Sequence, residues 1–323
     1  MCIRDRCSDD AFTTAAATLQ ARIDAFGKDS PEVAEWIRGQ DYVFENCFGA
    51  GSGYVPPRAP ADIDPLIQAD RAYQSAAALF YSSRYQEAAT AFRRIAADGA
   101  SPWASWGRYL AGRSLLWYAR ASGELTANYR GRLALAEAEL RQAIEADGPA
   151  EPRDAARWLL ARILVRTDPL EAAALLSGRL LSPLGAEVRA RELGLFAQLM
   201  DTLVDDPAVL AEVRSRVELV EWIFTFQQEG EAGADHAVVR WREEQSVAWL
   251  VAALAKIGPF HDATLELLAA AAQVQGHPAT STLGYYRAQL HIERGEQQQA
   301  IEALEGLGPD PVSYTHLTLP TKV

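Results

Sequence analysis

The residue types that most often carry chemistry are sparse in this chain and lie at spacings that fit no catalytic motif. Four histidines stand in the body of the sequence, at His236, His261, His277 and His291. None has the HExxH spacing of a zinc protease, and no cysteine lies at zinc-finger spacing from them. Histidines beside acidic residues at helix starts are more often capping or exposed groups than metal ligands or catalysts. The sequence therefore predicts no catalytic residue, no metal and no cofactor.

A glycine-rich run, GAGSG at 49–53, raises the hypothesis of a phosphate-binding loop. Such loops need a strand before the glycines and a helix after them, and a P-loop also needs a following Lys-Ser or Lys-Thr pair. A predicted helix precedes this run, and no such pair follows it. We interpret it as part of an irregular segment over 48–63, either a linker or an ordered loop.

Two cysteines in the body of the chain, Cys7 and Cys47, leave two readings open. Cys47 ends a predicted helix, where the helix dipole would raise the pKa of a thiol and disfavour a nucleophilic thiolate. A buried, unreactive Cys47 is the favoured interpretation. A bridge to Cys7 that pins the first helical hairpin is the alternative, and the spacing suits it.

The charge balance excludes some partners. The net charge is −12, which disfavours nucleic acid and anionic membrane surfaces and allows basic partners. The longest apolar run, Val247 to Ile257, is about half of the roughly 20 residues that a membrane span needs. Two Met against abundant Ala and Arg are typical of a GC-rich bacterial genome. Compartment and oligomeric state are left open.

Both ends of the chain resemble a translated sequencing-library tag. Residues 312–321, VSYTHLTLPT, match one strand of that tag, and residues 1–6, MCIRDR, match its reverse complement. Such segments are set aside before the fold is considered. We expect 1–6 and 311–323 to be foreign, and the remainder to be an internal fragment of a longer bacterial protein.

The apolar pattern between these ends is helical throughout. Tyr129, Leu133, Ala136, Leu140, Ala143 and Ile144 form one stripe with spacings of three and four. Acidic or serine residues before proline, as at Asp64-Pro65 and Asp206-Pro207, predict helix starts. The predicted helices are 9–26, 31–47, 65–81, 85–98, 102–121, 126–147, 152–166, 169–180, 185–203, 207–227, 235–256, 261–274, 278–293 and 296–306. We predict an N-terminal hairpin over 7–47 and a helical repeat domain over 64–310.

Two of the hairpins carry a recurring arrangement of small residues. In AYQSAAALFYSSRYQEAATAFRRIAAD, residues 72–98, Ala76 and Ala88 lie twelve apart. In YYRAQLHIERGEQQQAIEALEGL, residues 285–307, Ala288 and Ala300 repeat that spacing. Small residues allow two helix backbones to cross closely. These hairpins resemble tetratricopeptide repeats, and the whole is similar to uncharacterised bacterial proteins with degenerate repeats of this type.

The resemblance implies an all-α, right-handed α-solenoid that holds a protein or peptide in a concave groove. Carried over position by position, the groove would present Asp70, Tyr73, Ala77 and Tyr81 in the first hairpin, and Tyr285 and Gln289 in the second. For the tryptophans within helices, core packing is the first reading and a ligand groove the alternative. The expected function is a scaffold or adaptor without enzymatic activity of its own. The alternative is the non-catalytic helical part of an enzyme whose active domain lies outside this chain.

Overall fold

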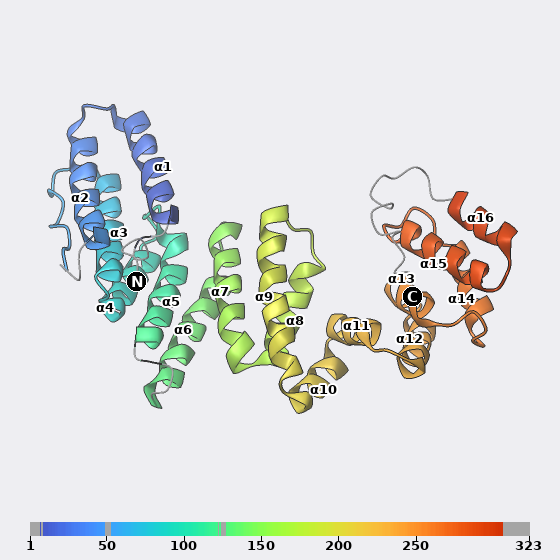
Figure 1. The fold of residues 1–323 in the computed structure, drawn as a ribbon. Helices are drawn as coiled ribbons and strands as arrows, with labels where there is room; N and C mark the ends of the chain where they lie inside the picture. Colours follow the sequence, from blue (N-terminus) through green and yellow to red (C-terminus); the bar gives the residue numbers. More distant parts are fainter. Residues whose placement is uncertain (1–6, 8, 49–52, 122, 124–126, 306–323) are drawn as a thin grey trace. The chain divides into compact units, whose positions relative to one another are not determined.

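The computed structural model describes residues 7, 9–48, 53–121, 123 and 127–305. Within these ranges the chain forms sixteen helices and no strand, so the all-α prediction is confirmed (Figure 1). The predicted tag segments and most of the GAGSG run lie outside the described residues. None of the helices in these ranges combines the length and apolar character needed to cross a bilayer.

The helices divide between two compact units. The first unit covers the described part of Met1–Asp168 together with Ala190–Leu195, and the second covers Pro169–Arg189 and the described part of Phe196–Val323. The first unit contains α1 (Asp9–Phe26), α2 (Pro31–Phe48), α3 (Pro65–Tyr81), α4 (Tyr85–Ala97), α5 (Ala104–Ala121), α6 (Ala127–Glu145) and α7 (Ala150–Thr167). The second contains α8 (Pro169–Leu180), α10 (Pro207–Arg216), α11 (Glu218–Gln227), α12 (Glu231–Glu244), α13 (Val247–Lys256), α14 (Thr264–Ala272), α15 (Thr280–Glu293) and α16 (Gln297–Glu305), and α9 (Ala186–Val204) has residues in both.

Helices that follow one another in the sequence also pack against one another. In the first unit this holds for every successive pair from α1 to α7, and in the second for α10 to α16. Most of these helices bury apolar side chains against their chain neighbours, which is the packing of a helical solenoid. The fold therefore depends on contacts that are short in sequence.

Helix starts follow the predicted capping chemistry. The Asp64 carboxylate accepts the backbone N–H of Leu66 at 2.8 Å, with Pro65 at the first helical position. The Asp206 side chain accepts hydrogen bonds from two backbone N–H groups at the start of α10 in the same way, and Pro207 is the first residue of that helix. Proline has no N–H that would be left unpaired at the first helical position. The capping aspartate and the proline after it therefore together mark where each helix begins.

Two predicted helices are each broken into a pair. The predicted helix over 207–227 is interrupted at Val217, whose φ of −123° is extended, and the result is α10 and α11. The predicted helix over 235–256 starts earlier and is interrupted at Gln245, which has a left-handed φ of 50°. The Ser246 hydroxyl then caps the next helix by accepting the N–H of Trp249 at 3.2 Å. The apolar periodicity of the sequence continues through both breaks, so it does not predict them.

The small residues of the two repeat-like hairpins are buried at helix crossings. Ala76 of α3 and Ala88 of α4 have no exposed surface, and these two helices pack together. Ala288 of α15 and Ala300 of α16 are 3% and 4% exposed. The spacing of twelve therefore marks close-packed positions in both units.

The first two helices are joined by a disulfide between Cys7 and Cys47, whose Cα atoms lie 5.5 Å apart. The favoured reading of an unpaired, buried Cys47 is therefore wrong, and the bridge is the alternative that holds. Helix α1 needs such an anchor, because none of its residues from 11 to 26 is fully buried. Helix α2, by contrast, buries Val33, Trp36 and Val43.

A buried ion pair fixes α3 against α2 and the loop that follows it. Arg71 donates to the Glu35 carboxylate at 2.8 Å, and both residues are 4% exposed. The same guanidinium donates to the carbonyl of Pro57 at 2.6 Å. Because Asn46 also holds Tyr54 through two backbone hydrogen bonds, the described part of the 48–63 segment is an ordered loop.

Candidate partner-binding pocket

A cavity of about 650 Å³ opens in the first unit, between α1, α2, α3, α5 and α7. Aromatic side chains dominate its walls, which is typical of sites that bind ligands through apolar contact. They are Trp36, Phe44, Tyr73, Tyr81, Trp103, Trp106, Tyr109 and Trp158. Helix α1 contributes small residues, including Thr13, Thr14 and Thr18, so its side of the cavity is open rather than filled. All four groove positions predicted in the first hairpin line this cavity.

Asp70, the first of these positions, is 1% exposed and already engaged. Its two oxygens accept Arg22 Nε at 2.6 Å and Arg22 Nη2 at 2.9 Å. One of them also accepts the indole N–H of Trp103 at 2.8 Å. The carboxylate is therefore neutralised within the fold, and its role at the pocket is to hold α1 and Trp103 against α3.

Tyr73 is half-buried and presents its ring edge-on to Phe92 while stacking on Trp103, with ring centroids 4.2 Å apart in the stack. Burial raises the pKa of Tyr73 well above its ordinary value, the nearby Tyr81 adds to the rise, and the Arg113 cation opposes it. The hydroxyl therefore stays protonated at physiological pH and is available as a donor. Tyr73 both packs against its neighbours and lines the pocket. The sequence alone does not tell which of the two roles this tyrosine has.

Ala77 and Tyr81 continue the same face of α3. Ala77 is 9% exposed and packs with Val43, and Tyr73 and Tyr81 cover that cluster from the pocket side. Tyr81 meets Phe80 edge to face at 5.4 Å. Ala77 thus lines the cavity between the two tyrosines of the same helix face.

Several residues of the pocket were not among the predicted groove positions. Trp106, Tyr109 and Arg113 come from one face of α5, and Trp158 comes from α7. Their spacing of three and four along α5 is a helical stripe, which the sequence shows but cannot distinguish from a core stripe. Trp103 and Trp106 are partly buried and line the cavity.

The two groove positions predicted in the second hairpin belong to the second unit. Tyr285 is half-buried and meets Tyr286 edge to face at 5.3 Å. Gln289 is exposed and donates to Glu293 at 3.1 Å. They do not line the cavity of the first unit.

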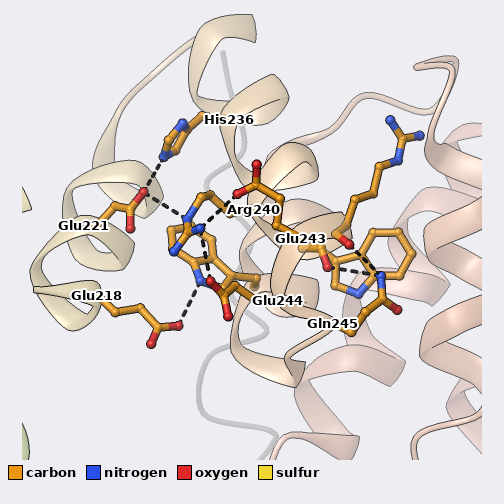
Figure 2. Close-up of polar contacts among 10 residues, drawn as sticks. Glu218, Glu221, His236, Arg240, Glu243, Glu244 and Gln245 are labelled. Atoms are coloured by element: carbon orange, nitrogen blue, oxygen red, sulfur yellow. Dashed lines mark hydrogen bonds and ion pairs between the residues drawn. The ribbon is translucent and has the colours of Figure 1, made fainter. Parts of the chain in front are cut away.

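The second unit instead carries a polar network on α11 and α12 that surrounds a buried tryptophan (Figure 2). The side chain of Arg240 bonds Glu221, Glu243 and Glu244 at 3.0–3.2 Å. The ring of Trp249 lies below the same guanidinium, 5.3 Å from Cζ to the ring centroid, and its N–H donates to Glu218 at 3.0 Å. His236 contacts Glu221 at 3.0 Å. Glu218, Glu221, His236, Arg240, Glu243 and Glu244 each contact another member of the network, which is the arrangement of a structural tie.

The other histidines have local partners too. His261 and His277 each accept the backbone N–H two residues ahead, both at 3.1 Å, as caps of helix starts. His291 contacts Glu296 at 2.7 Å across the turn between α15 and α16. Among the residues that the structure describes, no group of three or more His, Cys, Asp or Glu side chains is arranged to hold a metal ion.

Comparison with protein-family models, with curated proteins and with solved structures finds no match for this chain. The fold defines an all-α protein of solenoid type, built in two units, and the pocket of the first unit is a candidate site.

Proposed function

We propose that this protein is a tetratricopeptide-like interaction module whose first unit captures a segment of a partner protein in its aromatic pocket. The observation that carries the proposal is the cavity of about 650 Å³ in which aromatic side chains from α2, α3, α5 and α7 face one space. Rigid aromatic walls give large contact area at low entropic cost, and are enriched where proteins bind peptides. The proposal is one of binding without catalysis, as a scaffold or adaptor.

The volume of the cavity favours binding of a short segment of the partner rather than of a whole protein surface. About 650 Å³ accommodates a few side chains, and the small residues of α1 leave one wall free of bulk. A helical or extended peptide that inserts two or three apolar side chains would satisfy the pocket, with its backbone outside.

Site-specific photo-cross-linking tests this proposal. Benzoylphenylalanine is placed at Trp106, which lines the pocket, and separately at Trp117, which lies on the same helix, is 40% exposed and does not line it. After illumination in cells of the source organism, we expect mass spectrometry to find partner peptides joined to position 106 and not to 117. Equal labelling of the same proteins from both positions would contradict capture in the pocket.

The disulfide supports an oxidising compartment as the place of this capture, because such bridges persist outside the reducing cytosol. Thiol alkylation in intact cells, followed by mass spectrometry of peptides with Cys7 and Cys47, would show whether both are blocked from labelling. Full labelling of both thiols would contradict this location.

A further inference from the structure

Two arginines reach the pocket without a carboxylate partner. Arg113 of α5 stacks on Phe80, with 5.2 Å from Cζ to the ring centroid, and Arg191 stacks on Trp158 at 5.0 Å. Both line the cavity, and no described Asp or Glu forms an ion pair with either. A guanidinium held on an aromatic face keeps its N–H donors directed outward and unused. In a chain of net charge −12, two such cations in one pocket call for an explanation.

The carboxylate and amide oxygens that line the pocket already accept hydrogen bonds within the fold. Asp70 is occupied by Arg22 and Trp103. The side-chain oxygen of Gln74 accepts Arg71 at 3.2 Å, and that of Gln40 accepts Gln74 at 3.4 Å. A ligand that brings acceptors would meet the guanidinium groups of Arg113 and Arg191 and the hydroxyl of Tyr73.

Further cations surround this side of the first unit. Arg162 stacks on Trp158 at 4.8 Å from Cζ to the ring centroid. Burial, and then the neighbouring Arg120 and Arg166, lower the pKa of Arg162. Two guanidinium groups, those of Arg162 and Arg191, therefore lie on the Trp158 ring.

We infer that the segment captured by this pocket is acidic: Asp or Glu side chains of the partner pair with Arg113 and Arg191, and flanking apolar side chains lie on the aromatic walls. This inference rests on the proposed function. It reverses the expectation of a basic partner that net charge alone suggested, because the groups that face a ligand decide its recognition.

The first experiment selects a library of random dodecapeptides with amidated C-termini against the full chain. We expect the selected peptides to be enriched in Asp and Glu beside aromatic or aliphatic residues. Selected peptides that are neutral, or rich in Lys and Arg, would overturn the inference and leave the proposed function in place. If no peptide is selected, the proposed function fails, and the inference fails with it.

The second experiment is a double-mutant cycle on the tightest acidic peptide. Arg113→Gln should weaken its binding about tenfold or more, because a charge-assisted hydrogen bond is lost. The peptide with its critical Glu changed to Gln should bind the native chain and Arg113→Gln equally. The matched control, Arg94→Gln, removes the same charge from an exposed site on α4 and should leave binding unchanged.

Arg113→Lys separates charge from packing, since it keeps the cation and should retain part of the affinity. Melting temperature and helical circular dichroism verify that each variant is folded. Equal loss in Arg94→Gln, or equal loss of the Glu and Gln peptides on Arg113→Gln, would overturn the pairing of a carboxylate with Arg113. A selected peptide that binds only when its C-terminus is free would overturn the assignment to side chains.

Discussion

Ser83 and Gly295 occupy the same position in the two repeat-like hairpins. Each stands seven residues after a buried alanine, Ala76 or Ala288, and each has a left-handed φ, 64° and 76°. In both, the amide of this residue donates to the carbonyl three residues earlier at 3.0 Å, and the next amide donates to the carbonyl five residues earlier, at 2.9 and 2.8 Å. This double hydrogen bond closes the preceding helix and turns the chain into the next one.

Replacing Ser83 with Gly should stabilise the first unit. The left-handed backbone conformation costs free energy for a residue with a Cβ, whereas glycine adopts it without that cost. After the greater freedom of glycine in the unfolded chain is subtracted, we expect a gain of about 0.5–1 kcal/mol. Urea denaturation followed by circular dichroism measures it. The control is Ser82→Gly, at a right-handed φ of −83°, which should destabilise. A loss of stability in both variants would refute the strain at Ser83.

Gly295→Ala should have the opposite effect at the equivalent turn of the second unit. No atom lies within 4 Å of the place where a Cβ would stand, so the cost comes from the backbone and not from a clash. We expect a loss of about 1 kcal/mol. Thermal melting of this variant beside Gly258→Ala, which also has open space and no left-handed φ, isolates that cost. Similar losses in both would point to a cause other than the turn.

Ala88→Leu should destabilise the first hairpin by about 1–3 kcal/mol, because the extra atoms have no space at the crossing of α3 and α4. Ala97→Leu, at an exposed position near the end of the same helix, is the matched change and should be tolerated. Denaturant midpoints of the two variants provide the comparison. If Ala88→Leu is as stable as Ala97→Leu, the two helices do not cross closely there.

Glu35→Gln should be among the most destabilising single changes in the first unit. It leaves the Arg71 guanidinium buried without its carboxylate, and we expect a cost of about 3 kcal/mol or more. Glu137→Gln removes the partner of Arg141 in a partly exposed pair four residues apart and should cost a few tenths of a kcal/mol. Chemical denaturation at neutral pH distinguishes them, and equal costs would show that burial of the Glu35 pair is not what matters.

Removing the disulfide should release α1 first. The bridge closes a loop with a sequence separation of 40, so Cys7→Ser with Cys47→Ser should cost about 2–4 kcal/mol. Because α1 has no fully buried residue from 11 to 26, hydrogen exchange there should accelerate before that of α2. Protection of residues 11–26 that survives the loss of the bridge would show that packing, and not the disulfide, holds this helix.

The helical class, the capped starts and the small residues at crossings could all be predicted, because each depends on residues close in sequence. Asp64 with Pro65 and Ala76 with Ala88 are local signals of that kind. The break at Gln245 and Ser246 could not be predicted, since the apolar pattern continues through it and only the backbone angles reveal it.

The pocket could be predicted only in part. Tyr73 and Tyr81 follow from the resemblance of one hairpin, whereas Arg113 and Trp158 come from helices that match it poorly. Whether an aromatic stripe fills a core or lines a cavity depends on what the facing helix contributes, and here α1 contributes small residues. Net charge averages over the whole surface, so it carries no information on the two arginines that line the pocket.

The bonds of Asp70 have a consequence for how the molecule can be divided. One carboxylate joins Arg22, 48 residues before it, to Trp103, 33 residues after it. A fragment cut at the start of α3 would keep Asp70 and Trp103 but lose the cation, and a negative charge would remain in an apolar interior. The smallest autonomous piece of the first unit therefore has to begin ahead of α1, and grafting the aromatic wall onto another scaffold requires transplanting the N-terminal hairpin with it.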